Sequence, residues 1–389
     1  MSQGKRPKQI LSFLGASPYD EAEYELDGKT YLTPYTQEAL ARHYKDHTVL
    51  VAMTEEARSK HADGLRARGV NYTPIPIPSG SVEEELWAIF EAITEHVPEG
   101  AEVVVDISHS FRSQPVLALA ALRFLEAAKD VKVSRILYAS YDQRAKRGRF
   151  LDLTLFLTLM RWSEATSELV RYGFTRNLAT LLKEIQDDAW RGGKQGPKPQ
   201  RLKTLGQVLE ELGLALEFLR VPETLELARK LLEESKRVEE ESQAWLPAQP
   251  IRALLEKLRQ RYEPLAVEEA FSPDGLKAQA HMVDLLLEIG SYHQAAVLIR
   301  ELMVTKVCLD QGLHPLDKDG RDKAEEYLNQ WLKEGHDETL RQWGNTWKAL
   351  SDLRNDLAHA GMRKQARKGL GAERELQEKW AQIRNLLDL

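Results

Sequence analysis

The first third of the chain alternates short apolar runs with longer amphipathic segments. The run Val103-Val104-Val105 is the clearest strand signal, because consecutive β-branched residues suit a strand that is buried on both faces. The predicted strands are residues 10–14, 48–53, 72–77, 102–107 and 135–140, and the predicted helices are residues 36–44, 55–68, 81–96 and 113–129. This alternation predicts an α/β region, Rossmann-like, with a doubly wound and mostly parallel sheet.

The remainder of the chain has helical patterns, which predict an all-α second part. It opens with the apolar run 151–160, which we interpret as a core segment, because it is shorter than the roughly 18 apolar residues of a membrane span. Near its end, Leu350, Leu353 and Leu357 recur at i, i+3 and i+7, the spacing of a buried helical stripe. Gly361 is a natural stop for that helix.

Length, charge and cysteine content narrow the class of protein. A chain of 389 residues is long enough for two or three domains with ample core. Its formal net charge of −6 excludes a general polyanion-coating protein, so we expect any nucleic-acid contact to be a local basic patch. The single cysteine, Cys308, excludes an intramolecular disulfide framework. With neither a signal peptide nor a membrane span predicted, we expect a cytoplasmic protein.

Two predicted strand ends carry side chains that suit a ligand site. A small, flexible turn follows the first strand, and a turn rich in hydroxyls, with an imidazole and a guanidinium, follows the valine-rich strand and leads into a helix. Ligands of doubly wound sheets bind beyond the carboxyl ends of the strands, and free N–H groups at a helix start bind anions. The candidate ligand residues are Gly15, Ala16, Ser17, Ser108, His109, Ser110, Phe111, Arg112 and Ser113. A structural interpretation stays open, in which Asp106 ties down its turn and His109 bonds to backbone.

The leucine stripe at 350–357 is flanked by side chains that suit phosphate chemistry. Arg354, Asn355, Asp356 and His359 lie within six residues. Arginine can hold a phosphate with two hydrogen bonds, and histidine transfers protons near neutral pH. Arg354 and His359 are five residues apart and so do not share a helix face. The arginine side chain must therefore bend around the helix to reach this histidine, or it must contact a histidine of another chain. The alternative is an ordinary solvated helix face.

A dense basic cluster follows this stretch. Its members are Arg363, Lys364, Arg367 and Lys368. A run of charge near a candidate phosphate site favours contact with an RNA backbone. The alternative is a solvated surface.

Linked motifs in the first part resemble one family. Leu-Ser-Phe-Leu-Gly-Ala at 11–16, Ile-Pro-Ile-Pro-Ser-Gly at 75–80 and Val-Asp-Ile-Ser-His-Ser-Phe-Arg-Ser-Gln-Pro at 105–115 are similar to the CARF domains of CRISPR-associated proteins. The likeness covers roughly residues 8–165, and this chain has Ser108 and Ser110 where threonine and glycine are usual. Arg354-Asn-Asp-Leu-Ala-His359 resembles the Arg-x4-His signature of HEPN ribonucleases.

Together these resemblances imply a CARF–HEPN ribonuclease of type III CRISPR systems. They imply a CARF-like sensing domain at 1–165 and a helical HEPN-containing effector domain at 166–389, with the catalytic part at about 275–389. The implied activator is a cyclic oligoadenylate, with cyclic tetra-adenylate favoured over hexa-adenylate. The implied assembly is a homodimer or higher homo-oligomer in which two Arg-x4-His motifs face each other.

The implied reaction is metal-independent cleavage of single-stranded RNA. The ribose 2′-OH attacks the adjacent phosphate and leaves a 2′,3′-cyclic phosphate, with no cofactor and no metal. In this reaction His359 acts as general acid or base and Arg354 holds the phosphate. Asn355 positions either His359 or Arg354. Asp356 orients His359 or caps structure.

Two alternatives from other classes remain. One is a ring nuclease, in which the CARF domain degrades its own ligand with Ser17, Ser108 or His109 near the scissile 2′-OH. The other is a non-catalytic cyclic-oligoadenylate-binding regulator whose HEPN domain only dimerises.

Overall fold

The computed structural model describes residues 6–109, 114–191, 196–243, 249–334, 337–362 and 364–388. The chain divides into two compact units, Met1–Thr158 and Leu159–Leu389. The division falls within helix α5 (Leu155–Tyr172), and the boundary expected from the sequence, residue 165, lies in the same helix.

The first unit is an α/β fold with one mixed sheet. Among the described residues, eight strands pair in the order β3-β2-β8-β7-β6-β1-β4-β5. The strands are β1 (Lys8–Leu14), β2 (Ala22–Leu26), β3 (Lys29–Thr33), β4 (Thr48–Met53), β5 (Tyr72–Pro76), β6 (Glu102–Asp106), β7 (Lys132–Asp142) and β8 (Arg147–Asp152). The five predicted strands correspond to the parallel set β7-β6-β1-β4-β5, which confirms the doubly wound expectation. Strands β2, β3 and β8 were not predicted from the sequence, and the antiparallel pairs β2–β3 and β7–β8 make the sheet mixed.

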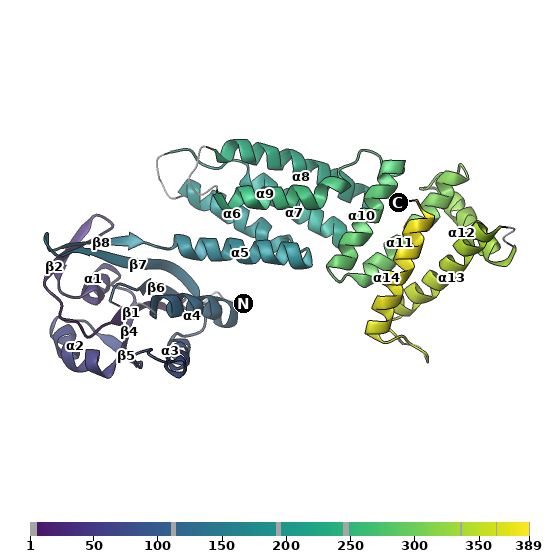
Figure 1. Cartoon of the computed structure of the whole chain (residues 1–389). Coiled ribbons are helices and arrows are strands. Elements are labelled where there is room, and N and C mark those ends of the chain that lie inside the picture. Colours follow the sequence, from purple (N-terminus) through teal and green to yellow (C-terminus); the bar gives the residue numbers. More distant parts are fainter. Residues whose placement is uncertain are drawn as a thin grey trace. The chain divides into compact units, whose positions relative to one another are not determined.

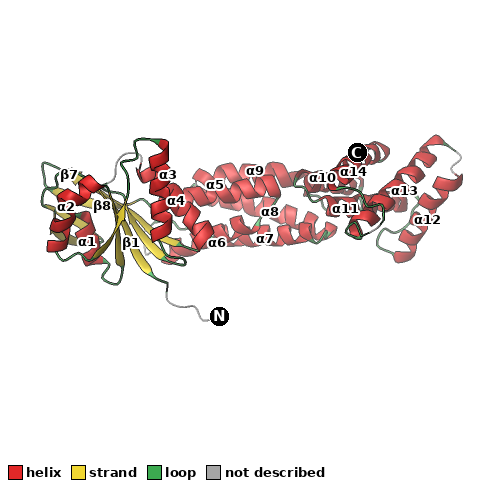
Figure 2. Ribbon diagram, turned by 90° about the horizontal axis from the view of Figure 1, so that it is seen from below, coloured by secondary structure: helices red, strands yellow, loops and turns green. Residues whose placement is uncertain are grey.

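Helices cover both faces of this sheet (Figures 1 and 2). They are α1 (Thr36–His43), α2 (Glu55–Ala67), α3 (Glu83–His96) and α4 (Gln114–Lys129). Val103 and Val105 pack in the core under α3 and α4, whereas Val104 packs in the core under α1 and α2. Burial on both faces explains why the strand is a continuous apolar run instead of an alternating one.

The strand order reverses direction between β1 and β6. From β1 the chain adds β4 and β5 on one side, and it then returns to add β6 and β7 on the other. In the register of this pair, Ser12 lies beside Asp106, so the turns that follow the two strands leave the same edge of the sheet. This is the position at which doubly wound folds bind ligands.

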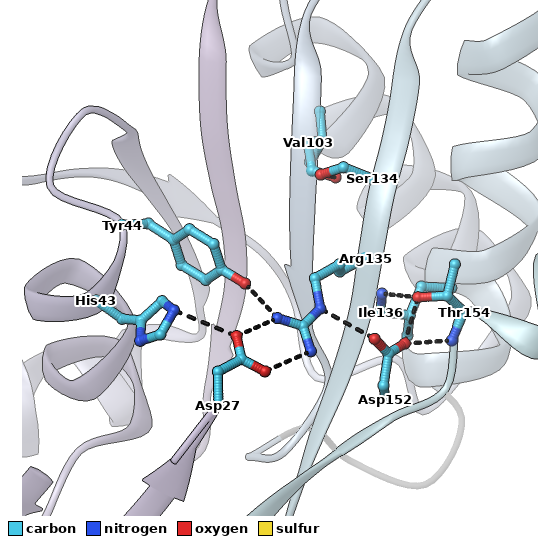
Figure 3. Close-up of polar contacts among 9 residues, drawn as sticks. All are labelled: Asp27, His43, Tyr44, Val103, Ser134, Arg135, Ile136, Asp152 and Thr154. Atoms are coloured by element: carbon cyan, nitrogen blue, oxygen red, sulfur yellow. Dashed lines mark hydrogen bonds and ion pairs between the residues drawn. The ribbon is translucent and has the colours of Figure 1, made fainter. Parts of the chain in front are cut away.

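A charge cluster ties the start of α5 to the sheet (Figure 3). Arg135 on β7 donates to Asp27 at 2.7 Å, to Asp152 at 3.0 Å and to the Tyr44 hydroxyl at 2.9 Å. Burial opposes the charge, but these partners raise the pKa of Arg135. Asp152 accepts the backbone N–H of Thr154 at 3.0 Å, at the point where β8 gives way to α5. The connection from β8 to α5 is therefore held to the sheet by side chains from four separate segments.

The second unit is all helical, as predicted. Its helices are α5 (Leu155–Tyr172), α6 (Arg176–Arg191), α7 (Leu202–Glu217), α8 (Val221–Ser242), α9 (Gln249–Tyr262), the short 3-10 helix η2 (Glu263–Leu265), α10 (Pro273–Glu288), α11 (Tyr292–Asp310), α12 (Lys318–Glu334), α13 (Glu338–Ala358) and α14 (Gly369–Leu386). One continuous apolar core runs through them, and it includes Cys308. Among the described residues, none of the helices combines the length and the apolar character needed to cross a membrane.

The interpretation of residues 151–160 as a core segment is wrong. Leu157 is buried, whereas Leu155, Phe156 and Leu159 are exposed on α5. Within this run, Leu157 packs in the core of the first unit, whereas the apolar side chains on either side of it face solvent. An apolar run of this length does not reveal which of its residues face the core, because nearly every position is hydrophobic.

Candidate functional site

The turns after β1 and β6 meet closely at the edge of the sheet. A Cβ atom on Gly15 would lie 3.0 Å from the Tyr19 hydroxyl and 3.1 Å from the backbone oxygen of His109, so glycine allows the two turns to approach. Ala16 is half-buried and Ser17 is exposed. The fold thus brings together the predicted residues Gly15, Ala16, Ser17, Ser108 and His109. Ser110, Phe111, Arg112 and Ser113 lie outside the described residues.

Beneath these turns lies a buried network centred on Asp106. Its carboxylate is fully buried and accepts hydrogen bonds from the Ser12 hydroxyl at 2.7 Å and the Thr36 hydroxyl at 2.8 Å. Gln37 adds bonds from its side-chain amide to Ser12 at 3.0 Å and to the backbone oxygen of Phe13 at 2.7 Å. Buried polar groups need such partners, so the network fixes the end of β1 against β6 and α1.

Ser108 belongs to this network through both its backbone and its side chain. Its N–H donates to Asp106 at 3.0 Å, and its hydroxyl also donates to that carboxylate. The same hydroxyl oxygen accepts the N–H of Ala139 on β7 at 2.8 Å. These contacts support the structural interpretation of Asp106, in which a strand-end carboxylate ties down its turn.

His109 has the least satisfied side chain at this edge. Its Nε2 atom is buried and has no hydrogen-bond partner among the described residues. Its ring lies 4.3 Å, centre to centre, from the ring of Tyr19. Burial lowers the pKa of His109, Asp106 opposes that shift, and the neighbouring His61 adds to it. His109 is therefore a neutral imidazole with one ring nitrogen unused.

Tyr19 closes the turn after β1 upon itself. Its hydroxyl donates to the backbone oxygen of Gly15 and accepts the N–H of Gly15, both at 3.0 Å. Burial raises the pKa of Tyr19 to about 12. The ring is thus held in one place, and it forms one wall beside His109.

The structure adds residues to this edge that the sequence analysis missed. From α1 come Thr36 and Gln37, and from α2 come Lys60, which reaches the backbone oxygen of Ala16 at 3.3 Å, and His61, which packs on Tyr19. Both helices were predicted, but these side chains follow no motif. Only the packing of α1 and α2 on the sheet brings them to the strand ends.

The second candidate site lies at the C-terminal end of α13. Leu350 and Leu353 are fully buried and Leu357 is half-buried, which confirms the apolar stripe. The helix ends at Ala358 with His359 as its C-cap, and Gly361 adopts a φ of 69°. His359 is exposed, and it sits at the end of the helix where the dipole favours positive charge.

Arg354, Asn355 and Asp356 have different surroundings. Arg354 is half-buried and donates to the side-chain oxygen of Asn355 at 3.0 Å. Asp356 is buried and accepts the backbone N–H of Arg367 at 3.1 Å. That bond ties the segment after the helix back onto α13, and so it supports the capping role predicted for Asp356. Among the described residues, Arg354 and His359 share no hydrogen bond, although both belong to the last turns of α13 and its C-cap.

The predicted basic cluster divides into free and paired side chains. Lys364 and Lys368 are exposed. The guanidinium of Arg367 binds Glu375 with two hydrogen bonds of 2.6 and 3.0 Å, and this partner raises the pKa of Arg367. Arg363 lies outside the described residues. Within the described part of the cluster, the two lysines are therefore the cations open to an RNA phosphate.

Comparison with known proteins gives one sequence match and one structural likeness. No family model matches the chain. The chain is 30% identical over 111 residues to CRISPR-associated protein MJ1674 of Methanocaldococcus jannaschii, and the aligned part covers 27% of this chain. It covers 18% of the relative, so the chain spans less than a fifth of that protein's length.

The chain is similar in structure to Enterococcus italicus Csm6 bound to cyclic hexa-2′-fluoro-hexa-dAMP, with a TM-score of 0.47 and 11% sequence identity. The superposition covers 98% of this chain and 94% of the Csm6 chain. A likeness at that level says nothing about activity. The sequence match, by contrast, is to a CRISPR-associated protein, the class of protein that the sequence motifs predict. The resemblance of this chain to CRISPR-associated proteins is therefore confirmed.

Proposed function

We propose that this chain is a cyclic-oligoadenylate-activated endoribonuclease of type III CRISPR defence that acts in the cytoplasm. The first unit binds the activator at the edge formed by β1 and β6, and the second unit cuts single-stranded RNA at the end of α13. The observation that carries the proposal is the exposure of His359 and the partial exposure of Arg354 at one helix end, directly above a buried leucine stripe. A cation and an imidazole that face solvent are the groups that an RNA phosphate needs.

The reaction uses the substrate's own 2′-hydroxyl as nucleophile. A base removes the proton from the 2′-OH, the bond from that oxygen to phosphorus forms, and the bond from phosphorus to the 5′-oxygen breaks. An acid delivers a proton to the departing 5′-oxygen, so the products are a 2′,3′-cyclic phosphate and a 5′-hydroxyl. His359 supplies one of the two proton transfers, and Arg354 stabilises the charge that grows on the phosphate oxygens.

One chain holds only half of this machinery. A single His359 cannot be both acid and base in one step, whereas two copies of the motif provide two imidazoles and two guanidinium groups. Two apolar side chains next to the motif, Met362 at 88% exposure and Leu370 at 83%, support a partner at this place. We therefore propose a homodimer or higher homo-oligomer with its α13 ends facing each other.

The first unit also has an uncovered apolar face. Trp87 on α3 and both Val116 and Phe124 on α4 are exposed, and the rings of Trp87, Phe90 and Phe124 form a chain of contacts at 5.9 and 5.3 Å. A second copy of the unit would cover this face. Because two-fold symmetry is commonest among homo-oligomers, such a dimer would match a ring of an even number of adenylates.

A second function, cleavage of the cyclic ligand in the first unit, is favoured by one observation. His109 holds a neutral imidazole, with a free ring nitrogen, at the ligand edge. Such a group can take a proton from a ribose 2′-OH. If this function holds, the activator is degraded on incubation with the protein, and a His109→Ala variant leaves it intact.

The test of the main proposal is an RNA assay with purified chain. Single-stranded labelled RNA is incubated in EDTA with cyclic tetra-adenylate, with cyclic hexa-adenylate, or with neither. We expect cleavage only with a cyclic oligoadenylate, strongest with the tetra-adenylate, and products that end in 2′,3′-cyclic phosphate. Cleavage that needs Mg²⁺ or Mn²⁺, or products that end in 3′-hydroxyl, would contradict the mechanism.

A further inference from the structure

Helix α2 places a second histidine at the ligand edge of the first unit. His61 is 8% exposed, and its Nδ1 lies 3.4 Å from the hydroxyl oxygen of Tyr35. Its other ring nitrogen, Nε2, is buried without a hydrogen-bond partner among the described residues. A buried ring nitrogen is normally satisfied, so an unused one calls for a partner that the chain itself does not supply.

His61 and His109 form a matched pair around Tyr19. The ring of Tyr19 lies 4.8 Å from the ring of His61 and 4.3 Å from that of His109, so both imidazoles pack against it. Both histidines have a buried Nε2 that no described residue bonds. They come from separate segments, one from α2 and one from the turn after β6, and the bonds between Tyr19 and Gly15 fix the ring against which both pack.

The polar groups around this pair leave both Nε2 atoms without a described hydrogen-bond partner, and a neutral imidazole can present an N–H donor at Nε2 to an acceptor oxygen of a ligand. Lys60, the residue before His61, reaches the same turn through the backbone oxygen of Ala16 at 3.3 Å and also binds the carboxylate of Glu56 at 2.6 Å. The carboxylate of Asp106 accepts hydrogen bonds from the hydroxyls of Ser12 and Thr36 and from Ser108, so its oxygens are already engaged. The other titratable groups that face the pair are Tyr19, Tyr24 and Tyr35, which are neutral phenols at neutral pH.

We propose that His61 is a ligand-binding residue that donates its Nε2–H to a phosphodiester oxygen of the activator. This inference rests on the proposed function, since it takes the β1–β6 edge as the activator site.

Two substitutions separate the ring nitrogens of His61. Asparagine places a polar atom near the position of Nδ1 and keeps the bond to Tyr35, but it has no atom at the position of Nε2. Glutamine reaches the position of Nε2 and restores a donor there. The control is His96→Asn on α3, where the histidine bonds to the backbone oxygen of Ala92 at 2.8 Å.

Binding of cyclic tetra-adenylate to the full chain is measured by calorimetry, beside a melting curve for each variant. We expect His61→Asn to weaken binding by about tenfold or more, equal to about 1.4 kcal/mol. His61→Gln should recover most of the affinity, and His96→Asn should bind like the wild type.

Several outcomes overturn the proposal. A folded His61→Asn variant with wild-type affinity removes His61 from the site and leaves the proposed function standing. Failure of His61→Gln to recover any affinity in a folded protein shows that His61 acts through packing. A wild-type chain that binds no cyclic oligoadenylate overturns both the inference and the proposed function.

Discussion

The two candidate sites are built in opposite ways. The edge formed by β1 and β6 is assembled from segments far apart in the sequence, and its central carboxylate, Asp106, is fully buried in hydrogen bonds. The site at the end of α13 comes from six consecutive residues, and His359 stands in solvent. In the part of the chain that the structure describes, the first site is thus held by side chains from several segments, whereas His359 at the second stands open to water, which weakens the stabilisation of charge on a reacting phosphate.

If the chain is the proposed ribonuclease, this difference explains why a single copy would be inactive, because the open end of α13 would need a second copy in the correct position. An activator works only through a difference in affinity between the inactive and active arrangements. We therefore expect changes at the first site to alter the amount of activator needed, and changes at the second to alter the rate itself.

The largest effect is expected from Arg354→Ala. Loss of the group that stabilises the charge on the phosphate should lower the cleavage rate by about 10²- to 10³-fold in a saturating-activator assay. The matched control is Arg341→Ala, which removes an exposed arginine from the same helix and should leave the rate unchanged. Equal loss in both variants would mean that general charge on α13, and not the motif, supports cleavage.

The next largest effect is a loss of folding stability when Asp106, the buried carboxylate of the ligand edge, is removed. Asp106→Ala leaves the hydroxyls of Ser12 and Thr36 without their acceptor. At about 1.5–3 kcal/mol for each bond to a charged group, we expect the unfolding free energy to fall by at least about 3 kcal/mol in chemical denaturation. Asp142→Ala removes a carboxylate that accepts the N–H groups of Arg144 and Ala145 at an exposed turn, and it should cost much less. Similar losses would contradict the central place of Asp106.

The same contrast explains what the sequence could predict. The α13 site is local, so the spacing of its residues predicted the leucine stripe and the end of the helix. At the ligand edge the motifs predicted the two turns, because they follow apolar strands that were easy to locate. His61 and Lys60 were not predicted, because tertiary packing alone carries α2 to that edge.

The missed strands have a different cause. Residues Ala22–Leu26 alternate buried and exposed positions, and β3 follows after the turn Asp27-Gly28, where both residues adopt positive φ. Both are hairpin signals. The alternation is short and carries charged residues on its outer side, so it was overshadowed by the stronger apolar runs. The interpretation of the 151–160 run failed for the opposite reason, since strong hydrophobicity did not mean burial.

A smaller effect is expected from the exposed lysines beside α13. Lys364→Gln with Lys368→Gln should weaken RNA binding and make it less dependent on salt, with a slope smaller by about 0.7 for each phosphate that the variant no longer neutralises. Arg367→Gln should leave the slope unchanged, because its guanidinium is bound to Glu375, and should lower stability instead. If the salt dependence of RNA binding changed only in Arg367→Gln, then Arg367, and not the two lysines, would be the side chain that contacts RNA.

The smallest effect is a pH dependence of stability from His109. Its pKa in the folded protein is lowered from 6.5, chiefly by burial, so above pH 6.5 both folded and unfolded chains hold it neutral. As the pH falls below 6.5, the unfolded chain binds a proton that the folded chain does not, and stability is lost until the folded pKa is reached. Melting curves between pH 7.5 and pH 5 should show a smaller loss for His109→Gln than for the wild type. Parallel curves would show that His109 carries no such shift.

The division of labour between the two sites is tested most directly by one titration of activator against RNA cleavage, made with His359→Ala and His109→Ala beside the wild type. We predict that His359→Ala binds cyclic oligoadenylate normally but cuts about 10²- to 10⁴-fold more slowly at saturation. We predict that His109→Ala reaches the wild-type rate only at about tenfold or more activator. Near-wild-type cleavage by His359→Ala, or an unchanged midpoint for a folded His109→Ala, would contradict the account.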